Sequence, residues 1–111
     1  MKLPSESRFA DKRIQKAFYE LEKGDAQKRE LFKVINQALD KIEDNAFSGI
    51  QIPKKLIPTY YIQKYKAKNL WKYDLPDGWR LIYSIINDEI VVVSLVLEWL
   101  NHANYEKRFK Y

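Results

Sequence analysis

The chain contains no cysteine and only one histidine among its 111 residues. The lack of cysteine excludes a disulfide framework, a thiol nucleophile and zinc sites built on thiolates. One histidine and scattered carboxylates form no recognisable set of metal ligands. We therefore expect a protein without a metal or a cofactor.

Long apolar segments are also missing. The longest apolar run, Ile90 to Leu97, contains Ser94 and is far shorter than the roughly 20 residues that span a bilayer. Met1-Lys2 is followed by polar residues, so the start of the chain predicts no signal peptide. With no repeat or low-complexity stretch, we expect one cytoplasmic domain, residues 1–111, with no membrane partner.

Basic and aromatic residues are abundant. The net charge is +5, and the chain has eight Tyr, five Phe and three Trp. A small basic protein often binds phosphate or an acidic partner, although a soluble surface rich in lysine gives the same charge. The three tryptophans (Trp71, Trp79 and Trp99) occupy predicted strand positions, which favours core packing over base stacking.

Two amphipathic helices are predicted after a short strand around Arg8-Phe9. Asp11 can cap the first helix and Gly24 can end it; its apolar face holds Ile14, Ala17, Phe18 and Leu21. Asp25 can cap the second, whose apolar stripe is Leu31, Val34, Ile35, Ala38, Leu39 and Ile42. The short connection predicts an antiparallel helical hairpin.

A three-stranded meander is predicted in the second half, with strands at Leu70–Leu75, Trp79–Ile86 and Ile90–Leu97. Its turns are Pro76-Asp77-Gly78 and Asn87-Asp88. Helices followed by an antiparallel meander predict an α+β fold, with the N-terminal helical hairpin packed on one face of a small antiparallel sheet.

Two segments allow alternative interpretations. Thr59–Lys66 fits a short helix with Pro58 at its first position, but it also fits a strand that has Lys64, Lys66 and Lys68 on one face. The residues from Glu98 to Tyr111 fit either a final helical turn or an extended tail.

Strand parity predicts which side chains the helical hairpin leaves uncovered. One face of the strand Trp79–Ile86 holds Arg80, Ile82, Ser84 and Ile86, and Arg80 is the only charged residue of that strand. The charged residues of the preceding strand, Lys72 and Asp74, also share one face. We therefore predict an open face with Lys72, Asp74, Arg80 and Ser84. The structural alternative for Arg80 is an ion pair with Asp74 or Glu98 on the sheet face. Residues after the last strand can fold back over it: His102, Tyr105, Lys107 and Arg108.

The stretch LPDGWRLIY, followed by WLNHANYEKRF, resembles the RelE/ParE superfamily of toxins from type II toxin–antitoxin systems. The resemblance covers about Ser7 to Phe109. It implies a RelE/ParE-like fold and a ribosome-dependent mRNA endoribonuclease in which a 2′-OH attacks the adjacent phosphate without a metal. It also implies three partners: a cognate antitoxin protein, mRNA and the ribosome.

Carried over by motif, the resemblance implies catalytic roles for Arg80, Lys72, His102 and Tyr105. It implies RNA-binding roles for Lys64, Lys66, Lys68, Lys107 and Arg108. Two departures from the family pattern keep other functions open: Asp74 stands where a further cation is expected, and the His102–Tyr105 gap is short. The alternatives are a ParE-like toxin that acts on a protein such as gyrase, an inactive homologue, and an accessory RNA-binding protein.

Overall fold

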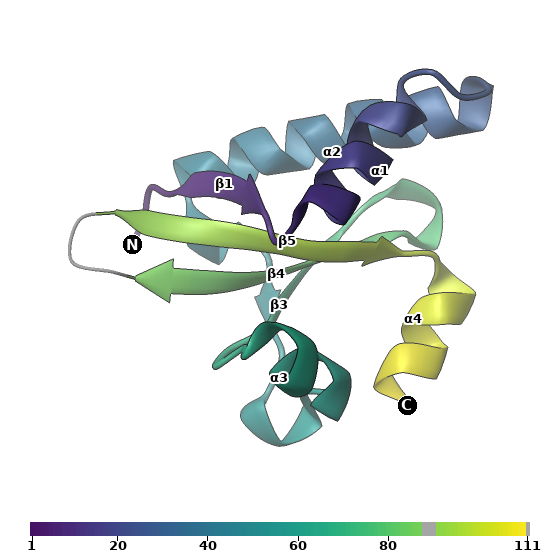
Figure 1. Ribbon diagram of the computed structural model, residues 1–111. Coiled ribbons are helices and arrows are strands. Elements are labelled where there is room, and N and C mark those ends of the chain that lie inside the picture. Colours follow the sequence, from purple (N-terminus) through teal and green to yellow (C-terminus); the bar gives the residue numbers. More distant parts are fainter. Residues whose placement is uncertain (88–90, 111) are drawn as a thin grey trace.

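The computed structural model describes residues 1–87 and 91–110, which form an α+β fold. The five-stranded sheet has the order β1-β5-β4-β3-β2; β1 is parallel to β5 and the other neighbours are antiparallel (Figure 1). The strands are β1 (Glu6–Phe9), β2 (Ile50–Gln51), β3 (Trp71–Asp74), β4 (Arg80–Asn87) and β5 (Val92–Leu100). The helices are α1 (Lys12–Leu21), α2 (Ala26–Asp44), α3 (Thr59–Tyr65) and α4 (His102–Phe109). Short 3-10 turns are η1 (Ala46–Ser48), η2 (Lys54–Leu56) and η3 (Pro76–Gly78).

Helices α1 and α2 form where the apolar spacing and the caps predict them. The Asp11 carboxylate accepts a hydrogen bond from the Ile14 N–H at 2.9 Å, and Asp25 accepts one from the Lys28 N–H at 2.9 Å. Each such cap contributes about 1 kcal/mol. The helix α1 ends three residues before Gly24, which does not take the positive φ expected of a terminating glycine.

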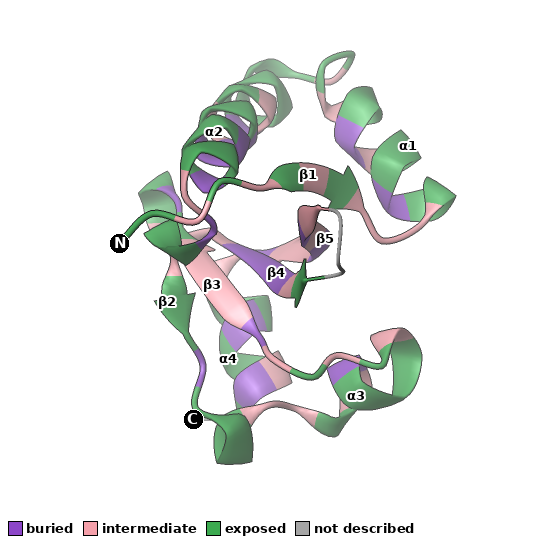
Figure 2. Cartoon of the chain, turned by 90° about the vertical axis from the view of Figure 1, so that its left-hand side faces the viewer, coloured by how far each residue is buried: buried purple, intermediate pink, exposed green. Residues whose placement is uncertain are grey.

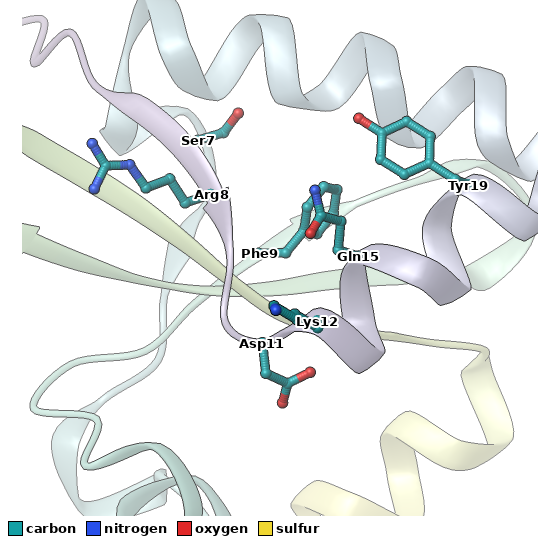
Figure 3. A pocket seen from close by; sticks show the side chains of 7 residues that line it. All are labelled: Ser7, Arg8, Phe9, Asp11, Lys12, Gln15 and Tyr19. Carbon is teal, nitrogen blue, oxygen red and sulfur yellow. The ribbon is translucent and has the colours of Figure 1, made fainter.

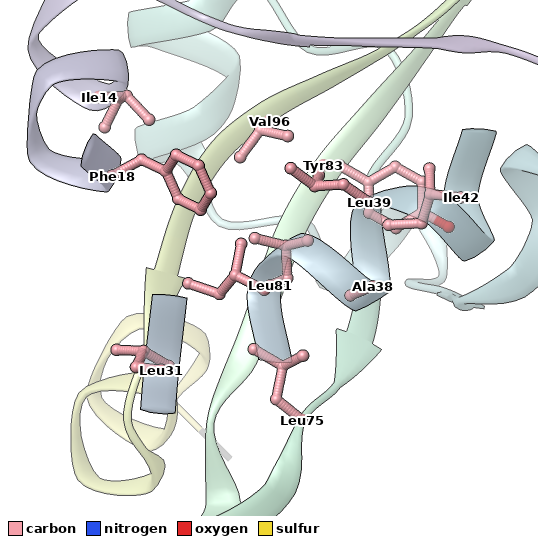
Figure 4. Close-up of a cluster of buried hydrophobic side chains, with 11 residues drawn as sticks. Ile14, Phe18, Leu31, Ala38, Leu39, Ile42, Leu75, Leu81, Tyr83 and Val96 are labelled. Atoms are coloured by element: carbon pink, nitrogen blue, oxygen red, sulfur yellow. The ribbon is translucent and has the colours of Figure 1, made fainter. Parts of the chain in front are cut away.

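The first hydrophobic core lies between the helical hairpin and one face of the sheet. Figure 4 shows side chains of α1 and α2 packed against Leu81 and Tyr83 of β4 and Val96 of β5. All three tryptophans pack against this cluster, as predicted. The Tyr83 hydroxyl donates to the Ala46 carbonyl at 2.7 Å and accepts from the Gly49 N–H at 3.1 Å, which fastens the η1 segment to the sheet.

The turn between β3 and β4 lies at Pro76-Asp77-Gly78, as predicted. Asp77 and Gly78 both have positive φ, 61° and 80°, and the Leu75 N–H donates to the Trp79 carbonyl at 2.9 Å. The second predicted turn is Asn87-Asp88. Asn87 is the last residue of β4, and Asp88 lies outside the described residues. A register shift at Ile82/Tyr83 marks a bulge between β4 and β5.

The prediction of an open second face was wrong over most of its length. Helices α3 and α4 cover it, on the opposite side of the sheet from α1 and α2 (Figures 1 and 2). A second core forms there from Ile52, Tyr61, Leu70, Ile82, Leu97, Leu100, Tyr105 and Phe109. Ser84 is buried and its hydroxyl donates to the Asn69 carbonyl at 2.9 Å. Because β4 and β5 are apolar on both faces, both faces need a cover.

The first ambiguous segment is helical, and the second is the end of a strand followed by a helix. The segment after Pro58 is the helix α3, with Pro58 at the N-cap position rather than the first helical position, and Lys66 ends it with a φ of 57°. The strand β5 continues to Leu100, and α4 follows it. The parallel strand pair β1–β5 and the short edge strand β2 were not predicted. Within residues 1–87 and 91–110, no helix combines the length and apolar character that a membrane span requires.

Candidate functional site

The predicted cations Lys72 and Arg80 converge at the end of the β3–β4 ladder. Asp74 is the register partner of Arg80, and Lys72 lies two residues earlier on the same face of β3. Both cationic side chains are largely covered, at 17% and 18% exposure. Sequence parity therefore placed these three side chains on one face correctly, but the predicted openness holds only for Asp74, which is 48% exposed.

Asp74 lies between the two cations. Its Oδ1 is 2.9 Å from Lys72 Nζ and 3.0 Å from Arg80 Nε, the latter an ion pair whose geometry falls short of a hydrogen bond. Lys72 Nζ also donates to Oδ2 at 3.1 Å, and Arg80 Nη1 donates to the Gly78 carbonyl. A carboxylate thus occupies the point where an anion would meet both cations. Asp74 itself is 48% exposed, so the cluster is open to solvent on that side.

Tyr105 forms the floor of the cluster. Its ring lies 5.1 Å from Arg80 Cζ and 5.8 Å from Lys72 Nζ, and it stacks on Phe109 with centroids 4.5 Å apart. Tyr105 is 3% exposed. The ring therefore supports both cations by packing and by cation–π attraction, which contributes about 0.5–1 kcal/mol for a contact of this kind.

His102 lies next to the same cluster but projects into solvent. It is the first residue of α4, its side chain is 62% exposed, and Nε2 is 2.9 Å from Glu106 Oε1 one turn later. Gly78 lies between His102 and Arg80, since a Cβ built on it would come 3.1 Å from His102 Cβ and 3.9 Å from Arg80 Nη1. A glycine at this turn therefore permits the start of α4 to approach Arg80 closely.

The structure separates the five predicted RNA-binding residues into two groups: one at the end of α3 and just after it, Lys64, Lys66 and Lys68, and one on α4, Lys107 and Arg108. Lys66 and Lys68 are exposed in the segment that leads from α3 to β3. Lys107 and Arg108 lie on α4, where they line a hollow of about 440 Å³ with residues of η2 and α3. Lys64, at the end of α3, donates to the Tyr60 hydroxyl at 3.2 Å, and this bond raises the pKa of the lysine.

Arg108 has structural contacts that the sequence did not reveal. Its Nη2 lies 3.4 Å from Glu98 Oε1, its Nε lies 3.3 Å from Oε2, and its Cζ lies 3.6 Å above the Tyr60 ring. Burial, with the nearby Glu98 carboxylate, raises the pKa of Tyr61 well above its ordinary range. The sequence signal for the contact of Glu98 was its position as a charged residue in an otherwise apolar strand. No feature of the sequence indicated the contact of Tyr60.

A separate hollow of about 460 Å³ lies between β1 and α1 (Figure 3). Two of its ionic groups serve the local fold: Arg8 pairs with Glu6 at 2.7 Å, and Asp11 caps α1. It contains none of the residues that the sequence indicated for catalysis or RNA binding. Among the described residues, no group of three or more His, Asp or Glu side chains is arranged to hold a metal.

The fold and the cluster define an α+β protein with a cation pair at one end of its central sheet. Comparisons of the chain with protein-family models, curated proteins and solved structures gave no significant match. The functional argument therefore depends on the residues and their geometry.

Proposed function

We propose that the chain is a RelE-like toxin of a type II toxin–antitoxin system, a ribosome-dependent endoribonuclease of mRNA that acts in the cytoplasm. The observation that carries the proposal is the convergence of Lys72 and Arg80 over the Tyr105 ring, beside the exposed His102. The order of two helices and then a meander, and the motif around Arg80, support the same assignment.

In the proposed reaction, the 2′-oxygen attacks the adjacent phosphorus and the bond to the 5′-oxygen breaks. The products are a 2′,3′-cyclic phosphate and a free 5′-hydroxyl. Charge accumulates on the non-bridging oxygens in the transition state, and Arg80 and Lys72 stabilise it there. The planar guanidinium of Arg80 can bind two phosphate oxygens at once.

The reaction also needs a base for the 2′-hydroxyl proton and an acid for the leaving oxygen. His102 is the candidate for proton transfer because histidine is the side chain that most often serves as a general acid or base, and this one is exposed on the other side of Gly78 from Arg80. Tyr105 is covered by the two cations and by Phe109, so we assign it a positioning role under Arg80 and Lys72 rather than proton transfer.

A cognate antitoxin would silence the site by covering Arg80. Acidic residues of such a partner would complement the basic cluster electrostatically.

A second candidate function is favoured by Asp74. Because this carboxylate already pairs with both cations, the exposed part of the face is mixed in charge rather than purely basic. A mixed face suits a protein target such as gyrase, as in a ParE-like toxin, or an inactive homologue.

Induced expression distinguishes these functions. The wild type is compared with Arg80→Ala, with Arg80→Lys, which keeps the charge but not the two-point grip, and with Arg29→Ala as a control on α2. We expect growth arrest with new in-frame mRNA ends by primer extension, lost in Arg80→Ala, reduced in Arg80→Lys and kept in the control. Circular dichroism verifies that each variant folds.

Other outcomes contradict the nuclease assignment. Arrest with intact mRNA would indicate a protein target. No arrest from folded, well-expressed protein would indicate an inactive homologue or an accessory RNA-binding protein.

A further inference from the structure

The hollow between α3 and α4 gathers positive charge from two separate segments. Lys55 comes from η2, and Lys107, Arg108 and Lys110 come from α4 and its C-terminal cap. A neighbouring hollow of about 330 Å³, lined by Leu100, Asn104, Lys107 and Arg108, continues it along α4. We call the two together the α3–α4 groove.

No acidic residue is found among the described residues that line the α3–α4 groove. Glu106, on α4, pairs with His102, and Glu98, on β5, pairs with Arg108. Cations that converge from separate segments repel one another unless an anion joins them. The charge of the groove therefore favours an anionic ligand.

An aromatic side chain is interleaved with these cations. Tyr60 lines the groove, and its ring lies under the Arg108 guanidinium, with Lys64 Nζ 5.4 Å from its centroid. The contacts with Glu98 and Tyr60 hold the guanidinium in place, and the same side chain lines both hollows. Fixed guanidinium planes and aromatic rings are surfaces on which unpaired bases stack, and lysines beside them bind the phosphates.

We infer that the α3–α4 groove is a second RNA site, which binds the phosphate backbone of a single-stranded flank of the RNA held at Lys72 and Arg80. This inference rests on the proposed function and deepens it. The two sites share α4: Tyr105 of that helix supports the Lys72–Arg80 pair, and Lys107 and Arg108 lie further along it. The substrate is therefore a strand longer than the two nucleotides at the cleaved bond.

The test measures binding of a fluorescent oligouridylate of about 12 nucleotides by anisotropy over a range of salt concentrations. The groove variant combines Lys55→Ala, Lys107→Ala and Lys110→Ala. The matched control has the same change in net charge on the exposed side of α2: Lys28→Ala, Lys33→Ala and Lys41→Ala. All six lysines are exposed in the described structure, so we expect both variants to fold.

Each lysine that contacts a phosphate contributes about 0.7 to the slope of log affinity against log salt for a single strand. We therefore expect the groove variant to lose about 2 units of slope and about 100-fold in affinity near 0.1 M salt. The control should keep the wild-type slope. Equal losses in both triple variants, or no loss in the groove variant, would overturn the inference.

Two further arms keep this inference separate from the proposed nuclease. After induced expression, primer extension on cellular mRNA should show no new ends for Arg80→Ala, while Arg80→Ala should keep most of the wild-type salt slope in the oligouridylate titration. If Arg80→Ala cleaves normally while the groove variant loses RNA binding, the nuclease site is wrong and the groove remains an RNA site. If polyglutamate binds the wild type as strongly as RNA and loses as much in the groove variant, the ligand is an acidic protein and the RNA assignment fails.

Discussion

Replacing Asp74 by Asn tests whether the Lys72–Arg80 pair is an anion site that its own carboxylate partly neutralises. The substitution keeps the side-chain shape and removes one negative charge that lies within 3.0 Å of both cations. A phosphate bound between the cations would lie about 5 Å from that charge. The repulsion is then about 0.8 kcal/mol in water and about 3 kcal/mol at an effective dielectric constant of about 20.

Because Asp74 is 48% exposed, the value near the aqueous end applies, about 1 to 1.4 kcal/mol. We therefore expect Asp74→Asn to bind oligouridylate roughly five- to tenfold more tightly at low salt. The slope of log affinity against log salt should steepen by about 0.7, since one more cation is available to a phosphate. The free energy of unfolding should fall by about 1 kcal/mol, because Lys72 and Arg80 lose their common partner.

Anisotropy titrations give the affinity and urea denaturation gives the stability. Asp40→Asn, on the exposed side of α2, makes the same change in net charge and is the control. Tighter binding together with lower stability, in Asp74→Asn alone, is the expected result. Unchanged or weaker binding by a folded Asp74→Asn protein would refute the assignment of this cluster as a phosphate site.

The remaining predictions concern the turn and the buried tyrosine. Gly78→Ala should lower the free energy of unfolding by about 1 to 2 kcal/mol, because its φ of 80° strains an L-residue and its Cβ would lie 3.1 Å from His102 Cβ; urea denaturation that matches the wild type would contradict this. Burial raises the pKa of Tyr83 from its ordinary value of 10.0 to about 12. Because this pKa is higher in the folded protein, the contribution of Tyr83 to the free energy of unfolding is fully present below pH 10. That contribution, about 3 kcal/mol, is lost as the pH rises through 12. Tyr83→Phe should lose correspondingly less over that range, and parallel stability curves for the two proteins would show the reasoning to be wrong.

The candidate site could be predicted only in part. Strand parity put Lys72, Asp74 and Arg80 on one face, because the alternation of side chains along a strand is a local property. The sequence left open whether Arg80 pairs with Asp74 or with Glu98. The register between β3 and β4 decided for Asp74, which also pairs with Lys72. The residues of the α3–α4 groove are further apart still, from Lys55 to Lys110, and only the packing of α4 brings them together.

By itself, the sequence determined the two N-terminal helices, their aspartate caps, the order of the meander strands and the Pro76-Asp77-Gly78 turn. These features depend on spacing and backbone chemistry within a few residues. The tertiary structure alone decided that β1 joins β5 in parallel, that α3 and α4 bury the second face, and that Tyr105 lies beneath Arg80 and Lys72. The physical reason is that burial of an apolar face requires a cover, but its periodicity does not specify which distant segment provides that cover.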